Sequence, residues 1–186
     1  MVIDEHVQQQ HVEQAADRLW CYLVDLRGNL YAIPDEPRTV LLPHISHLPP
    51  VTPLPLGLVP SYVLGLANIN QRGDVVIDLA AFLGLSGDPV AEEQRRLLVI
   101  GEKTAHPLFA QPGREPYRLA FVVDGGYELI QVETSGQGAE GQSFVRELIT
   151  TPRGQATLLE MEAICRAVLH ELGAERPWNA VVELSA

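Results

Sequence analysis

The chain contains an internal repeat, and this constrains its fold more than any other feature. Residues 60–83, PSYVLGLANINQRGDVVIDLAAFL, are similar to residues 143–164, SFVRELITTPRGQATLLEMEAI. Each copy has an apolar segment, a turn that contains glycine, an apolar strand, an acidic residue and the start of a helix. At an offset of 82 residues the aligned pairs are Ser61 with Ser143, Tyr62 with Phe144, Val63 with Val145, Leu66 with Leu148, Asp78 with Glu160, Leu79 with Met161 and Ala81 with Ala163. Because a repeat indicates equivalent structural units, we predict two similar small subdomains.

Composition and local patterns predict a mainly β fold. The chain of 186 residues is 46% hydrophobic and 20% charged, which is typical of a globular protein of one domain or two small ones. Its fourteen prolines and fifteen glycines mark many turns, and β-branched runs such as residues 75–77 favour strands. Further strands are expected at residues 19–26, 30–33, 97–100, 118–123 and 127–132. Leu66, Ile77 and Leu79 are expected in the core of the first subdomain.

One helix is predicted at the end of the second repeat. Residues 158–172 carry apolar side chains at helical spacing, and Gly173 follows as a terminator. The residues on the apolar face are Leu158, Met161, Ile164, Val168, Leu169 and Leu172. Residues 1–18 are polar and rich in glutamine, which predicts a tail or a short helix.

Charge and cysteine content narrow the class of protein. Thirteen basic and twenty-four acidic residues give a net charge of -11, with Lys103 as the only lysine, so a nucleic acid or an anionic membrane surface is not expected as a partner. The chain carries Asp4 and Glu5 where a secretion signal would have basic residues, and no apolar run is long enough to span a membrane. These features predict a cytoplasmic protein without membrane insertion. Cys21 and Cys165 are isolated among apolar residues and are expected to be reduced core residues.

The sequence contains no motif of a known catalytic or metal site. A phosphate-binding glycine loop, a nucleophile elbow and a cysteine quartet are all missing. His44 and His47 form a His-x-x-His pair without a third ligand, so we expect no metal, cofactor or catalytic residue. A small-ligand or metal-binding β-barrel that uses this pair remains an alternative. Asp78 and Glu160 could act as paired carboxylates, but their place between a strand and a helix favours helix capping.

One run of residues carries a family signature: Pro53-Leu54-Pro55, Pro60-Ser61-Tyr62-Val63-Leu64-Gly65-Leu66-Ala67-Asn68, Arg72-Gly73, Val76-Ile77-Asp78-Leu79 and Phe82-Leu83-Gly84-Leu85. This run resembles the motif of CheW-like coupling proteins of bacterial chemosensory systems, and the resemblance extends over roughly residues 19–165. It implies two intertwined, small five-stranded β-barrels (SH3-like subdomains) with short helices, no cofactor and no catalysis. Such an adaptor binds the regulatory domain of a CheA-type histidine kinase and the cytoplasmic tip of a methyl-accepting chemoreceptor.

The resemblance also divides the chain and suggests partner-binding residues. We expect a first barrel at residues 19–90, a second at 91–157, the C-terminal helix at 158–173 and a tail at 174–186. In the turn after the motif strand, Asn68, Arg72 and Gly73 are candidates for binding a partner. Exposed apolar groups on strand edges and in the proline-rich segment are candidate anchors, unless they pack under their own loops: Val40, Leu42, Ile45 and Leu54.

Two departures from the family pattern leave a second interpretation open. Family members usually place Arg-Gly two residues after the motif asparagine, whereas Arg72 comes four residues after Asn68. His44 lies where many members carry a glutamate that can pair with the motif arginine. The chain could therefore be a CheW-like scaffold module that no longer couples a kinase. The leading interpretation is an adaptor in chemotaxis or in type IV pilus control.

Overall fold

The computed structural model describes residues 17–35, 39–41, 48–55, 57–100, 118–135 and 144–173. Within these ranges the chain is mainly β with short helices, as predicted. The strands are β1 (Asp17–Leu26), β2 (Asn29–Pro34), β3 (Thr39–Leu41), β4 (Val51–Thr52), β5 (Val63–Ile69), β6 (Arg72–Asp78), β7 (Arg96–Ile100), β8 (Leu119–Thr134), β9 (Val145–Thr151) and β10 (Gly154–Leu159). The helices are α1 (Leu79–Phe82), a 3-10 turn η1 (Glu92–Gln94) and α2 (Met161–Glu171).

The strands form one sheet that is organised in two halves around the long strand β8. The order is β4-β5-β6-β8-β1-β2-β10-β9, and β7 lies between β8 and β3. The first part of β8 pairs with β6 and β7, while the remainder pairs with β1. We call β3 to β7 with the start of β8 the β5–β6 half, and β1, β2, β9 and β10 with the end of β8 the β9–β10 half. Neither half closes into a ring of paired strands within the described residues.

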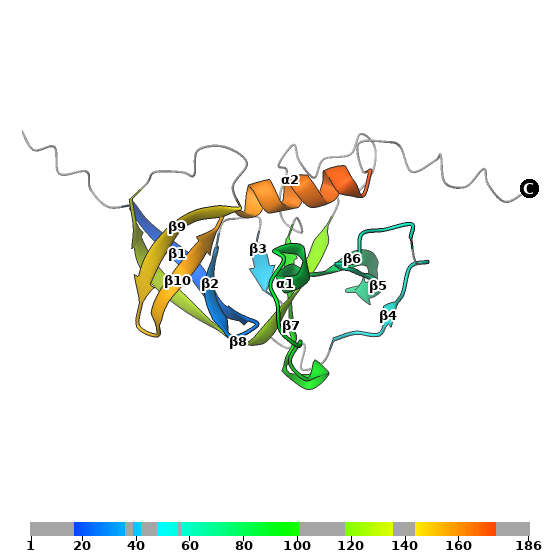
Figure 1. Ribbon diagram of the computed structural model, residues 1–186, viewed down its shortest axis with the longest axis horizontal. Coiled ribbons are helices and arrows are strands. Elements are labelled where there is room, and N and C mark those ends of the chain that lie inside the picture. The colour runs from blue at the N-terminus through cyan, green and yellow to red at the C-terminus, as the bar shows by residue number, and fades with distance from the viewer. Residues whose placement is uncertain are drawn as a thin grey trace, which may run out of the picture.

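Strands from the start of the chain lie in the half that contains the second repeat. β1 and β2 begin the chain but pair with the end of β8 and with β10, whereas β7 pairs with β3 and with the start of β8. A division of the chain at residue 90 therefore separates the repeats in sequence but does not separate the two halves in space. Figure 1 shows β1 and β2 beside β10, on the opposite side of the molecule from β4, β5 and β6.

The repeat seen in the sequence is a repeat of structure. β5 and β9, β6 and β10, and α1 and α2 begin at residues 63 and 145, 72 and 154, and 79 and 161, which is an offset of 82 each time. The junctions agree as well: the Asp78 amide donates to the Tyr62 carbonyl, and the Glu160 amide donates to the Phe144 carbonyl, both at 2.9 Å. The two units therefore share backbone geometry as well as sequence.

The largest hydrophobic cluster joins the two halves. It contains Ile33 of β2, Ile77 of β6, Phe121 of β8 and Ile164 of α2, all fully buried. Helix α2 follows the β9–β10 half in the chain and extends over the neighbouring half (Figure 1). Its buried residues, which include Cys165, belong to this shared core.

The two cysteines are core residues, as predicted. Cys165 is buried in the cluster between the halves, and Cys21 is buried in a second cluster inside the β9–β10 half. A third cluster fills the β5–β6 half around Ile69, Val76 and Val99.

Two expectations about single residues were wrong, one about the start of the helix and one about the core. Leu158 lies in β10, not in the helix, which begins at Met161. Leu158 and Ala156 are both buried, which follows the alternation of a strand. An apolar residue at position 158 fits both the strand period and the helix period, so the sequence pattern did not separate them. Leu66 is 39% exposed, because strand alternation directs its neighbour Ala67 into the core instead. Ile77 and Leu79 are buried, as predicted.

Candidate partner-binding surface

The predicted partner-binding residues Asn68, Arg72 and Gly73 all belong to the β5–β6 hairpin, where strand alternation places the Arg72 side chain on the opposite face from that of Asn68. Asn68 pairs with Gly73 and Ile69 pairs with Arg72 across the ladder. Asn68 and Gly73 are exposed, and Arg72, the first residue of β6, is half-buried. We call residues 68–73 the hairpin tip.

The turn of this hairpin differs from the expectation. Its two central residues are Asn70 and Gln71, with φ of 53° and 64°, so the turn precedes the Arg-Gly pair. Positive φ at both positions is the geometry of the tight turns that suit twisted strands, and asparagine tolerates it better than most residues. Asn68 and Arg72 therefore belong to strands. Two amide side chains, not an arginine and a glycine, occupy the turn itself.

Exposed or half-buried apolar side chains occur on β5 and in the segment that precedes it. Leu66 is on the same exposed face of β5 as Asn68, and Leu58 in the preceding segment is 75% exposed. Leu54 is half-buried and lies two residues after β4, which pairs with β5. Apolar groups bordered by polar ones are typical of protein interfaces. Sequence reasoning included Leu54 but not Leu58, and it wrongly placed Leu66 in the core.

Three of the proposed anchors cannot be placed on this surface. The backbone of Val40 is in β3, paired with Val99 of β7, but its side chain is outside the described part of the structure. Leu42 and Ile45 lie outside the described residues.

Gly65 explains why the motif contains a glycine at this point. Its φ is +146°, and a Cβ atom at this position would lie 2.2 Å from the Thr52 carbonyl oxygen and 2.8 Å from Cγ1 of Val51. The register of β5 and β6 shifts between Val63 and Gly65. A glycine is thus required for β4 to approach β5.

A buried ion pair lies beneath the hairpin tip, and sequence reasoning missed it. Arg118 donates from Nε to Asp74 Oδ1 at 2.8 Å, from one terminal nitrogen to the other carboxylate oxygen, and from the same nitrogen to the Ile69 carbonyl at 2.8 Å. The side chains of Arg118 and Asp74 are 1% and 2% exposed. Asp74 alternates with the core residue Val76, and an acidic residue at an inward strand position is a signal that a basic partner is required.

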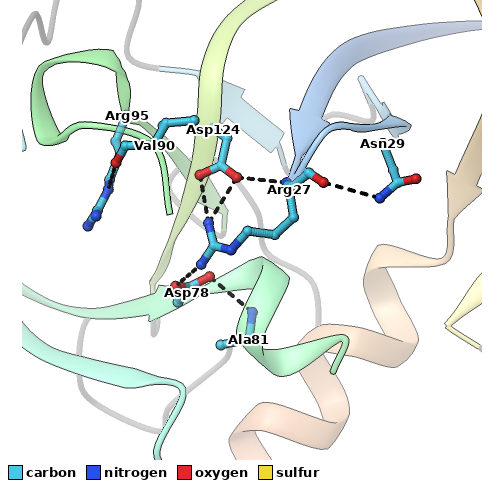
Figure 2. A network of polar contacts seen from close by, with 7 residues as sticks. All are labelled: Arg27, Asn29, Asp78, Ala81, Val90, Arg95 and Asp124. Carbon is cyan, nitrogen blue, oxygen red and sulfur yellow. Dashed lines mark hydrogen bonds and ion pairs between the residues drawn. The ribbon is translucent and has the colours of Figure 1, made fainter. Parts of the chain in front are cut away.

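A second network joins the two halves at Asp124 of β8, where the register with β1 shifts (Figure 2). Arg27, in the turn between β1 and β2, donates from Nη1 to both Asp124 oxygens at 2.9 Å and from Nη2 to Asp78 at 2.7 Å. The Arg27 backbone amide also donates to Asp124 at 2.8 Å. Burial disfavours the charge of Arg27, but the hydrogen bonds to Asp124 and the charge of Asp78 outweigh it and raise the arginine pKa above its ordinary value.

The two repeat carboxylates are held by arginines in separate networks. Asp78 accepts from the Ala81 amide at 3.0 Å and caps α1, as predicted. Glu160 precedes α2 but makes no such cap bond, so this part of the prediction was wrong. Its carboxylate instead accepts from Arg146 at 2.9 Å. Both carboxylates thus have structural partners.

The described residues contain no group of three or more His, Cys, Asp or Glu side chains that could hold a metal ion. His44 and His47 lie outside the described residues. Across the ranges that the structure describes, no helix has the length and apolarity needed to cross a membrane.

Comparison with solved structures finds a likeness to a scaffolding protein. The structure is similar to the crystal structure of the scaffolding protein TtCheW from Thermoanaerobacter tengcongensis, with a TM-score of 0.53 and 15% sequence identity. The similarity covers 77% of this chain and 90% of the other. No family model matches the chain, and no curated protein matches its sequence. The chain therefore has a CheW-like fold, as the sequence resemblance implied.

Proposed function

We propose that this protein is a non-catalytic adaptor that couples chemoreceptors to a CheA-type histidine kinase in bacterial chemosensory signalling. The observation that carries the proposal is the fold shared with a scaffolding protein over 77% of this chain. The motif residues support it, because the hairpin that contains them is exposed at Asn68 and Gly73. The pathway would be chemotaxis or type IV pilus control, and the site of action the cytoplasm.

An adaptor needs two surfaces that different partners can occupy at the same time. The fold supplies two equivalent units, β5 with β6 and β9 with β10, and the surfaces of those units have diverged. Leu66 and Leu148 are equivalent, and both are exposed. Asn68 and Thr150 are also equivalent and exposed, but their side chains differ. We propose that the hairpin tip with Leu54, Leu58 and Leu66 contacts one partner. The net charge of -11 would favour a basic surface on that partner.

Titration calorimetry with the two proposed partners tests this function. The full chain is titrated with the regulatory domain of a CheA-type kinase and, separately, with a soluble fragment of a chemoreceptor tip. Affinities on the order of micromolar are expected for a reversible signalling complex. Binding of neither fragment would refute the proposal. Binding of the receptor fragment alone would favour the scaffold module that does not couple a kinase.

Variants at the hairpin tip locate the surface. Arg72→Ala and Asn68→Ala are expected to weaken binding of one partner by about 1 to 3 kcal/mol if these residues are important contacts. Thr150→Ala is the matched control, because Thr150 is the exposed equivalent of Asn68 in the other repeat. Equal affinities of all three variants and the wild type would show that the hairpin tip is not the contact.

A further inference from the structure

The hairpin tip extends beyond the strands on both sides of it. On the β5 side, the last residue paired with β4 is Ala67, opposite Val51. On the β6 side, pairing with β8 begins at Val75, opposite Leu119. Within the described residues, the backbone of residues 68–73 therefore has strand pairing only inside its own hairpin. A two-residue turn with two positive φ values lies at its end.

Arg118 lies where the pairing of β6 with β8 begins. It directly precedes Leu119 of β8, so the parallel register places it beside Asp74, which directly precedes Val75 of β6. Its guanidinium reaches both strands of the hairpin, through the Asp74 carboxylate on β6 and through the Ile69 carbonyl on β5. Ile69 immediately precedes the turn and is itself 2% exposed. A single side chain thus connects β8 to both sides of the tip.

A buried ion pair is not required for stability at such a position. Removing two charges from water is costly, and apolar residues of similar volume often stabilise a protein as well or better. A leucine or methionine, however, cannot donate to a carbonyl oxygen. The rigid fork of an arginine fixes the direction of several hydrogen bonds at once. Orientation is therefore the property that this pair supplies and an apolar pair cannot.

We propose that Arg118 is a positioning residue, which holds the hairpin tip in the orientation in which Asn68 and Arg72 meet their partner. This inference rests on the proposed function, because that function supplies the partner. The orientation of the hairpin tip, however, is a property of the chain alone. Preorganising a binding segment increases affinity because less conformational freedom is lost on binding. Loosening the tip is then expected to weaken binding without removing any contacting residue.

The test separates stability from orientation. The double variant Arg118→Met with Asp74→Leu removes both charges and keeps the site filled. Its urea midpoint is expected to stay near that of the wild type. Amide hydrogen exchange at residues 69–73 is expected to become roughly tenfold faster, since local opening is easier. Affinity for the partner that the hairpin tip binds is expected to fall by a similar factor.

Two controls are available in the same chain. Exchange at residues 151–155, the equivalent turn in the other repeat, should stay unchanged in the double variant. The pair Arg146→Met with Glu160→Leu removes a less buried ion pair from the other half and should leave exchange at residues 69–73 unchanged. Arg118→Lys keeps the charge but loses the fork, so it should accelerate exchange at the tip even if the double variant does not fold.

The outcomes distinguish this inference from the proposed function. Wild-type exchange at residues 69–73 in the double variant, or in Arg118→Lys where only that variant folds, would overturn the positioning role. Faster exchange with unchanged affinity for the bound partner would also overturn it, because orientation would then be irrelevant to binding. If the wild type binds neither fragment, the proposed function fails, while the exchange experiment still decides whether Arg118 orients the tip.

Discussion

Asp78 and Glu160 occupy equivalent positions 82 residues apart, but only Asp78 caps the helix that follows it. The Asp78 carboxylate accepts from the Ala81 amide and from Arg27, and its side chain is 15% exposed. Glu160 accepts from Arg146 in a pair whose side chains are 26% and 21% exposed. The same place in the repeat thus serves two purposes. Asp78 links a helix start, through Arg27, to Asp124 of β8, while Glu160 forms a local pair within its own half.

Alanine substitutions at Asp78 and Glu160 should lower the free energy of unfolding by different amounts. Asp78→Ala removes a cap, worth about 1 kcal/mol, and leaves Arg27 beside Asp124 with one partner fewer in a buried network. We expect it to lower the free energy of unfolding by about 3 kcal/mol. Glu160→Ala should lower it by only about 1 kcal/mol. Urea denaturation of both variants measures the difference, and equal losses would show that the Arg27 network contributes little.

Core and surface leucines give a second contrast. Leu79→Ala should lower the free energy of unfolding by about 2 to 5 kcal/mol, because Leu79 is fully buried in the cluster between the halves. Leu66→Ala should cost less than about 1 kcal/mol, since Leu66 is largely on the surface. Thermal or urea unfolding provides the measurement. A small loss for Leu79→Ala would mean that this side chain is peripheral to the core.

Alkaline pH should weaken the fold through Tyr22. Burial raises the pKa of Tyr22 to about 12, and a hydrogen bond to Asp35 acts in the same direction. The unfolded chain loses this proton near pH 10, where a free tyrosine titrates, while the folded chain still holds it. The contribution of Tyr22 is therefore fully present below pH 10 and disappears as the pH rises through about 12.

A phenylalanine variant isolates this effect. Between pH 9 and pH 11, about the range in which a free tyrosine ionises, the urea midpoint of the wild type should fall more than that of Tyr22→Phe. Tyr62, whose pKa is also raised by burial and by its hydrogen bond to Glu171, remains in both proteins and accounts for a shared decrease. Parallel pH profiles of the two proteins would contradict the assignment to Tyr22.

Local patterns in the sequence predicted the features that depend on neighbouring residues. The repeat, the mainly β fold, the burial of Leu79 and the cap at Asp78 all follow from alternation, turn residues and strand-to-helix junctions. The position of the turn did not follow, because Asn70-Gln71 and Arg72-Gly73 are both acceptable turn pairs and only the pairing of Ile69 with Arg72 decides between them.

Interactions between distant residues could not be predicted in this way. Arg27 and Asp124 are 97 positions apart, and Arg118 and Asp74 are 44 positions apart. Their meeting depends on the pairing of β1 with β8 and on the parallel register of β6 and β8. The inward position of Asp74 is a signal for a basic partner that the sequence analysis did not use, and nothing in the sequence identifies which of the arginines that partner is.

The motif glycine provides the last prediction. Gly65→Ala should disrupt the approach of β4 to β5, because the new methyl group would lie 2.2 Å from the Thr52 carbonyl oxygen and the backbone has a φ of +146°. The strain alone costs about 1 to 3 kcal/mol, and the displaced strand adds to it. Gly73→Ala is the matched control, since a Cβ at Gly73 meets no atom within 4 Å, and it should change stability by less than about 0.5 kcal/mol. Urea denaturation compares the two, and amide exchange in β5 reports whether β4 has moved away. Equal stability of both variants would mean that the glycine in the motif is not required by the contact with β4.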